Sequence, residues 1–97
     1  MSAMYLARYS FDGDPDALEP AYRRLQAGYP PDLLELQVAV RRADGLDVYD
    51  ACPDEATFRT FSVSAEFRAA TSDAGLPAPR IDGLGEVVAA SLKQPVG

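Results

Sequence analysis

The sequence predicts a single α+β domain in which a four-stranded antiparallel sheet carries its helices on one face. Three observations lead to this prediction. Segments with a two-residue hydrophobic period alternate with segments whose apolar residues recur every three or four positions. Two of the period-two segments are separated only by a short turn, so they form a hairpin. The chain has 97 residues, which suits one domain over residues 1–97.

The first two elements are a strand and a helix. Residues Met4–Phe11 alternate between two faces and are aromatic on one of them, which predicts a strand. Turn residues follow at 12–15, and then apolar residues recur at helical spacing: Leu18, Ala21, Tyr22, Leu25 and Tyr29. Pro20 would remove a backbone hydrogen bond deep inside a helix, so the start of this helix stays open. The run Gly28–Pro31 ends it.

The middle of the sequence predicts the hairpin. Residues Leu33–Arg41 have a strict period of two, with Leu34, Leu36, Val38 and Val40 alternating with Glu35, Gln37, Ala39 and Arg41. We expect the helices to cover the leucine and valine face. Residues Arg42–Gly45 supply the turn, and Leu46–Cys52 returns as the second arm.

The second helical segment begins at Pro53 and is expected to be broken in two. Its apolar stripe is rich in aromatic residues, with phenylalanines at 58, 61 and 67 that should be core. The stretch Phe61–Ser64 is a poor helix interior, because serine competes for backbone hydrogen bonds and valine loses rotamers. Ser64 should therefore cap a second short helix, which ends at Gly75. Residues Arg80–Leu92 give the last strand, with a helical turn over GEVVAASL, residues 85–92, as the alternative that composition leaves open.

Composition excludes several kinds of partner. The net charge is −6, and acidic and basic residues are interspersed. Nucleic acid is therefore not an expected partner, because phosphates call for clustered lysine and arginine. The N-terminus lacks a basic segment followed by an apolar one, and no stretch reaches ~18 apolar residues. We expect a cytoplasmic protein without a membrane segment.

Composition also limits the chemistry. The chain has no histidine, so a histidine general base, a histidine-bound metal and a histidine-ligated haem are excluded within one chain. The acids at 12, 14 and 16 lack the other oxygen ligands of a calcium loop and are interpreted as helix-entry residues. We therefore expect no metal and no cofactor. Cys52, the single cysteine, precedes a helix and is either a nucleophile or an inert core residue.

The stretch CPDEATFRTFSVSAEFRA, residues 52–69, carries a family resemblance. It is similar to the strand-end and helix pattern of the dimeric α/β-barrel superfamily, near its antibiotic-biosynthesis-monooxygenase-like and stress-responsive branches. That pattern is roughly Trp-x-Asp/Ser-x-x-x-Phe followed by Ser-Pro-His/Glu-Phe. Asp54 and Phe58 match it, Cys52 replaces the Trp, and Ser64–Phe67 has Ala in place of Pro. The resemblance implies a ferredoxin-like βαββαβ fold and a homodimer whose two sheets face each other as a barrel.

Five polar residues are candidates for binding a ligand between the two sheets of such a barrel: Arg8, Ser10, Glu35, Gln37 and Tyr49. The strand alternation puts Glu35 and Gln37 opposite the face assigned to the helices. Arg8 is the expected partner of a buried carboxylate, since an unpaired buried charge is costly. In the alternative interpretation, these side chains are solvated or only hold the dimer together.

Three functions stay open. The first is binding of a small, partly apolar molecule without turnover. The second, which the resemblance suggests, is a cofactor-free monooxygenase that acts on a phenolic or polyketide-like substrate through Tyr49 and Arg8. The third is a structural assembly domain whose barrel is filled with side chains.

Overall fold

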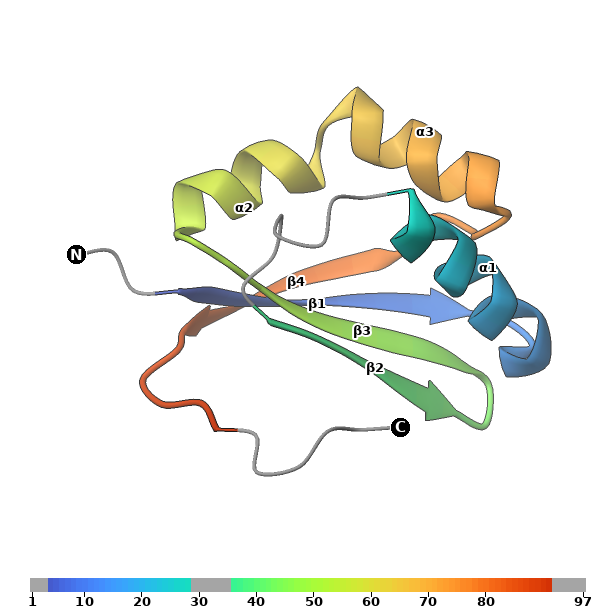
Figure 1. Cartoon of the computed structure of the whole chain (residues 1–97), viewed down its shortest axis with the longest axis horizontal. Helices are drawn as coiled ribbons and strands as arrows, with labels where there is room; N and C mark the ends of the chain where they lie inside the picture. Colours follow the sequence, from blue (N-terminus) through green and yellow to red (C-terminus); the bar gives the residue numbers. More distant parts are fainter. Residues whose placement is uncertain (1–3, 29–35, 92–97) are drawn as a thin grey trace.

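One antiparallel sheet with its helices on a single face makes up the fold (Figure 1). The structure, a computed structural model, describes residues 4–28 and 36–91. Its elements are β1 (Tyr5–Asp12), α1 (Pro15–Ala27), β2 (Leu36–Arg42), β3 (Gly45–Cys52), α2 (Glu55–Ser62), α3 (Ala65–Ala74) and β4 (Arg80–Glu86). The strands lie in the order β2-β3-β1-β4. The predicted ferredoxin-like α+β fold is confirmed.

The helices begin and end where local chemistry favours it. The Asp14 side chain accepts a hydrogen bond from the Asp16 amide at 2.9 Å, and the helix begins at Pro15. Pro20 therefore lies inside α1, on its exposed side. The predicted break after α2 is confirmed, because Ser64 Oγ accepts from the Phe67 amide at 3.1 Å and caps α3.

The core lies between the helices and one face of the sheet. Alternate residues of β1 and β3 point into it, together with aromatic and aliphatic side chains of the helices: Tyr5, Ala7, Tyr9, Phe11, Leu18, Ala21, Tyr22, Leu46, Val48, Cys52, Phe58 and Phe67. The Tyr9 ring packs against Phe67 with a centroid separation of 5.3 Å, and Phe61 packs against Phe67 at 4.9 Å. The predicted phenylalanine cluster thus joins α2 and α3 to the sheet.

The expected orientation of β2 is wrong. Ala39 pairs with the buried Val48, and directly paired residues of antiparallel strands share a face, so Ala39 faces the helices. Val38 pairs with Tyr49 on the other face and is 46 % exposed. A period of two fixes the alternation and leaves the choice of face open. Here β2 is an edge strand, and its long polar residues reach the polar side of α1: Arg41 ion-pairs with Asp16.

The last strand is shorter than expected. Pairing of β4 with β1 stops at Glu86, opposite Tyr5, and residues 87–91 continue without strand structure. The Val87 amide donates one more bond, to the carbonyl of Met4, the residue before β1, at 2.8 Å. The predicted strand residues 33–35 and the turn residues 29–31 lie outside the described part of the chain.

One glycine is required by close packing in the hairpin. A Cβ on Gly45 would lie against the Phe11 carbonyl oxygen and 2.6 Å from Arg42 Nη2. The Arg42 guanidinium occupies this space because it binds the Phe11 carbonyl and the carboxylate of Asp47. The absent side chain thus lets the hairpin lie directly against β1.

We predict that Gly45→Ala lowers the free energy of unfolding by about 1–3 kcal/mol, because the added methyl displaces backbone or the Arg42 guanidinium. Gly28→Ala is the matched control: Gly28 has φ −87°, and the nearest atom that an added Cβ would meet is the Leu25 carbonyl oxygen, at 3.5 Å. Urea unfolding midpoints measure both variants. Equal midpoints for the two variants would contradict the packing argument.

Candidate functional site

The face of the sheet without helices, here called the open face, carries a row of paired side chains across its centre. Val38, Tyr49, Arg8 and Asp82 pair in turn across β2, β3, β1 and β4. Arg8 Nη2 lies 3.1 Å from Asp82 Oδ2. Asp82 and then Tyr49 raise the pKa of Arg8, so the guanidinium stays charged. Its Nε is buried and has no hydrogen-bond partner among the described residues.

The residues on either side of this central row differ in character. On one side, Leu36, Ala51 and Leu6 pair across the first three strands, and the row is apolar. On the other side, Ser10 lies between Asp47 and Arg80 and is 6 % exposed. The open face is therefore apolar at one end and polar at the hairpin end.

The polar end is held by a structural cluster around Arg42. Its guanidinium bonds to Asp47 at 2.9 Å, to Asp44 at 2.6 Å and to Asp12 at 3.1 Å. Asp12 also pairs with Arg80 at 2.9 Å. Arg42, followed by Arg80, lowers the pKa of Asp12, so this carboxylate stays ionised. The cluster ties the hairpin to β1 and β4, and all its carboxylates are neutralised by arginine.

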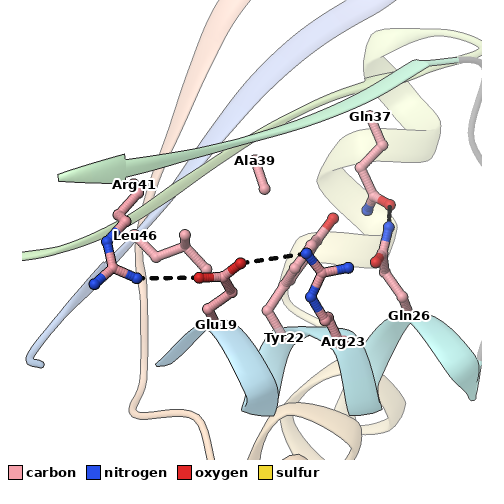
Figure 2. A pocket seen from close by; sticks show the side chains of 8 residues that line it. All are labelled: Glu19, Tyr22, Arg23, Gln26, Gln37, Ala39, Arg41 and Leu46. Atoms are coloured by element: carbon pink, nitrogen blue, oxygen red, sulfur yellow. Dashed lines mark hydrogen bonds and ion pairs between the residues drawn. The ribbon is translucent and has the colours of Figure 1, made fainter. Parts of the chain in front are cut away.

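A pocket of about 230 Å³ lies on the other face, between α1 and β2. Figure 2 shows two polar bridges from the helix to the strand, with the side chains of Ala39, Tyr22 and Arg23 between them. Gln26 Nε2 donates to Gln37 Oε1 at 3.0 Å, and Arg41 Nη1 lies 3.0 Å from Glu19 Oε2. The lining residues are Glu19, Tyr22, Arg23, Gln26, Gln37, Ala39, Arg41 and Leu46.

Two buried polar residues were missed by the sequence reasoning: Tyr22, which lines this pocket, and Asp50, which pairs with the lining residue Gln37. Asp50 on β3 pairs directly with Gln37, faces the helices and is 4 % exposed. Burial raises the pKa of Asp50 to about 7. Tyr22 on α1 is 5 % exposed, and burial and then the charge of Asp50 raise the pKa of its hydroxyl. Neither Asp50 Oδ1 nor the Tyr22 hydroxyl has a hydrogen-bond partner in the described part of the chain.

A signal for Asp50 was present in the sequence. The arm Leu46–Cys52 alternates, and its apolar face contains Leu46, Val48 and therefore also Asp50. A carboxylate at a core position of a strand is a candidate for a perturbed pKa and for function. No comparable sequence signal marks Tyr22, because a tyrosine at helical spacing is an ordinary core residue.

The five predicted ligand residues divide between the two faces. Arg8, Ser10 and Tyr49 lie on the open face, with Arg8 and Tyr49 directly paired. Gln37 was expected to join them and instead lines the pocket beside α1, for the reason given for the whole of β2. Glu35 lies outside the described residues.

Cys52 is packed in the core at 2 % exposed. Burial, Asp50 and Asp54 raise the pKa of its thiol to about 11, so the thiolate is scarce at neutral pH. This favours the inert interpretation over a nucleophile. Among the described residues, no group of three or more Asp, Glu, Cys or His side chains is placed to hold a metal ion. Within residues 4–28 and 36–91, no helix is long and apolar enough to cross a membrane.

Comparison with known proteins identifies the fold. No protein-family model matches the chain, and no curated protein matches it either. The chain is similar in structure to SnoaB, a cofactor-independent oxygenase from Streptomyces nogalater, with a TM-score of 0.57 and 14 % sequence identity. The match covers 95 % of this chain and 97 % of SnoaB. The resemblance expected from residues 52–69 is confirmed at the level of the fold.

We predict that Asp50→Asn changes how stability depends on pH. The folded pKa of about 7 lies above the ordinary value of 3.8, so the folded state binds more protons than the unfolded state between these values. Stability from this group is therefore full below about pH 4 and lost as pH rises toward 7. Relative to the unsubstituted protein, Asp50→Asn should gain about 2 kcal/mol between pH 5 and pH 8.

Urea unfolding at both pH values measures this difference. The comparison cancels the ionisable groups that the Asp50 charge does not affect. The pKa values of Tyr22 and Cys52 are raised by that charge, but both groups stay largely protonated between pH 5 and pH 8. Parallel pH profiles for the two proteins would show that Asp50 is ordinary in the folded state.

Proposed function

We propose that the chain acts as a homodimer whose two open faces pack together, and that it binds a small, partly apolar molecule between the sheets. The observation that carries this proposal is the Arg8–Tyr49 pair at the centre of the open face, beside an apolar row. Such a combination offers an aromatic surface and a cationic donor at one position.

The exposed apolar side chains of the open face support the dimer. Val38 and Val40 are 46 % and 43 % exposed, and their pairing with Tyr49 and Asp47 places them on the open face of the edge strand β2. Exposed apolar residues gathered on one face mark interaction surfaces. A twofold axis through the open face would place each patch against its copy, as an isologous interface requires. A chain of 97 residues also gains from burying more apolar surface.

The central row supports a ligand within that interface. Between two sheets, Arg8 would lose solvent, and a buried guanidinium is stable only when its donors are bonded. Asp82 satisfies Nη2, but Nε has no partner among the described residues. A ligand oxygen, such as a carbonyl or phenolate, would accept from this group. The Tyr49 ring and the leucine side chains beside it would contact the apolar part of the molecule.

A cofactor-free monooxygenase is the second candidate, and the similarity to SnoaB favours it. SnoaB is a cofactor-independent oxygenase, and the shared fold spans nearly the whole of both chains. A polyketide-like substrate such as anthrone has an acidic ring CH₂ group. Oxidation by O₂ to the quinone places one oxygen atom on that carbon and releases the other as water. Arg8 would stabilise the substrate anion, and Tyr49 would orient it.

We predict that the protein is dimeric and that Val38→Lys makes it monomeric, because a charge would be buried in the paired open faces. Val63→Lys is the matched control, since Val63 is 70 % exposed and is the C-cap residue of α2, a helix on the other face of the sheet. Light scattering over a dilution series reports the mass of each protein. The proposed interface fails if the unsubstituted protein stays monomeric, or if both variants remain dimers.

We also predict saturable binding of anthrone under anaerobic conditions, weakened at least tenfold by Arg8→Gln. The loss reflects a charge-assisted hydrogen bond, worth about 1.5–3 kcal/mol. Arg59→Gln is the control, because Arg59 lies on α2 away from the open face and pairs with Glu55. Calorimetry measures the affinities.

Oxygen uptake then separates the two candidate functions. Uptake above the spontaneous rate, reduced in Tyr49→Phe, would support the monooxygenase. Binding without uptake would support a binding protein. A dimer that does neither would leave the structural assembly domain.

A further inference from the structure

Carboxylates neutralise the arginines of the open face, within the part of the chain that the structure describes. The three arginines are Arg8, Arg42 and Arg80, and their carboxylate partners are Asp12, Asp44, Asp47 and Asp82. The ion pairs that join them are 2.6 to 3.1 Å long. Four negative charges against three positive ones leave this group of side chains with a net charge of −1. Two such faces packed together therefore bring no surplus positive charge into the interface.

The pair at the centre of the face is Arg8 with Asp82. The two residues are directly paired on β1 and β4, so their Cβ atoms lie about 5 Å apart on the same face. Their side chains are 37 % and 48 % exposed, so a molecule that lies on the open face can reach both. Asp82, followed by Tyr49, raises the pKa of Arg8, and the guanidinium stays charged. A ligand that contacts Arg8 thus also meets the negative charge of Asp82.

The neighbouring rows cannot supply the missing positive charge. Arg80 lies in the row beside Arg8, across from Ser10, but its guanidinium pairs with Asp12 at 2.9 Å. Arg42, followed by Arg80, lowers the pKa of Asp12, so this carboxylate stays ionised and keeps its hold on both arginines. The row on the other side of Arg8 is apolar. The charge that a ligand meets at the centre is therefore set by one ion pair.

Enclosure between two sheets would make this charge balance decisive. Removal of water lowers the local dielectric constant, so charges interact more strongly. An anion bound to Arg8 would share the guanidinium with Asp82 and leave two negative charges against one positive charge, a costly arrangement away from water. An uncharged acceptor, such as a carbonyl oxygen, leaves the pair neutral. A guanidinium has five N–H donors, enough to serve a carboxylate and a carbonyl oxygen together.

We propose that Asp82 determines which ligands bind between the sheets: by neutralising Arg8, it favours an uncharged molecule with a hydrogen-bond acceptor and excludes an anion of the same shape. This inference rests on the proposed ligand site between the two open faces and narrows its ligand class. Asp82 acts through Arg8 and by its own charge, since a like charge placed against the wrong ligand is a general source of specificity. A substrate anion formed after an uncharged molecule has bound is compatible with this selection.

Two probes of nearly the same shape test the selectivity for charge. Anthracene-9-carboxamide is uncharged, whereas anthracene-9-carboxylate is anionic at neutral pH. Calorimetric titration of the unsubstituted protein gives the affinity for each probe. We expect the carboxamide to bind at least about tenfold more tightly than the carboxylate. Equal affinities, or tighter binding of the carboxylate, would overturn the inference.

Two variants test whether Asp82 causes the selectivity. Asp82→Asn keeps the size of the side chain and removes its charge, so we expect carboxylate affinity to rise at least about tenfold while carboxamide affinity stays nearly constant. Glu55→Gln is the matched control, because Glu55 is 49 % exposed against 48 % for Asp82, pairs with Arg59 and lies on α2. It removes the same charge from the chain and should leave the ratio of the two affinities unchanged.

The ratio of the two affinities separates a charge effect from a structural one. A partial loss of folded protein in Asp82→Asn would weaken both probes together and would not change their ratio. An unchanged ratio in Asp82→Asn, or an equal change in Glu55→Gln, would overturn the role of Asp82. Adding Arg8→Gln to Asp82→Asn should abolish the gain in carboxylate affinity, because the uncompensated guanidinium is its cause.

The same titrations keep this inference apart from the site on which it rests. If the unsubstituted protein binds both probes equally and loses both in Arg8→Gln, the site between the sheets stands and the inference on Asp82 fails. If neither probe nor anthrone binds, the ligand site itself fails, and the inference falls with it.

Discussion

The pairing of β1 with β3 is the interaction on which the rest of the structure depends. Residues Tyr5–Asp12 pair one to one with Gly45–Cys52, without a bulge. This register places the aromatic side of β1 and the apolar side of β3 on one face, where the helices cover them. It also places Arg8 directly beside Tyr49 on the other face. The core and the open face are thus two consequences of one register.

Irregularity is confined to the edges of this central pair. β4 joins β1 with a shift between Leu6 and Ala7, where Gly85 and Gly83 are the paired residues. A Cβ on Gly83 would lie 3.2 Å from the Phe58 ring, so the glycine lets β4 approach the core closely. On the opposite edge, β2 turns its valines away from the helices. The edge strands β2 and β4 therefore differ from regular pairing where they pack against the helices, whereas the central strands β1 and β3 keep one regular register.

The helices and strands could be predicted from the sequence because residues close to one another in the chain determine where each begins and ends. The Ser64 cap, the Gly75 helix end and the turn before Gly45 depend on residues close in sequence, and all were predicted. The orientation of β2 depends on residues far apart, such as Arg41 and Asp16, and alternation alone cannot decide it. The pocket beside α1 has the same origin. Its existence depends on how far the helix lies from an edge strand, which no local pattern encodes.

Asp50 is an acidic residue at a core position, and burying its carboxyl group costs folding free energy. A carboxyl group at 4 % exposure, with one oxygen unbonded among the described residues, disfavours the folded state at neutral pH. An apolar residue would fit the alternation of β3 better. Positions that break a local rule without structural compensation are where function is expected.

Tyr49 and Asp50 belong to different faces of the sheet although they are neighbours in the chain. They are consecutive on β3 and therefore point to opposite faces of the sheet. Strand β3 is paired on both sides, so its backbone is held in place by β1 and β2 together. A side-chain substitution at one position leaves that backbone pairing intact. The two faces can therefore be altered separately, and chemistry found on one face need not be attributed to the other.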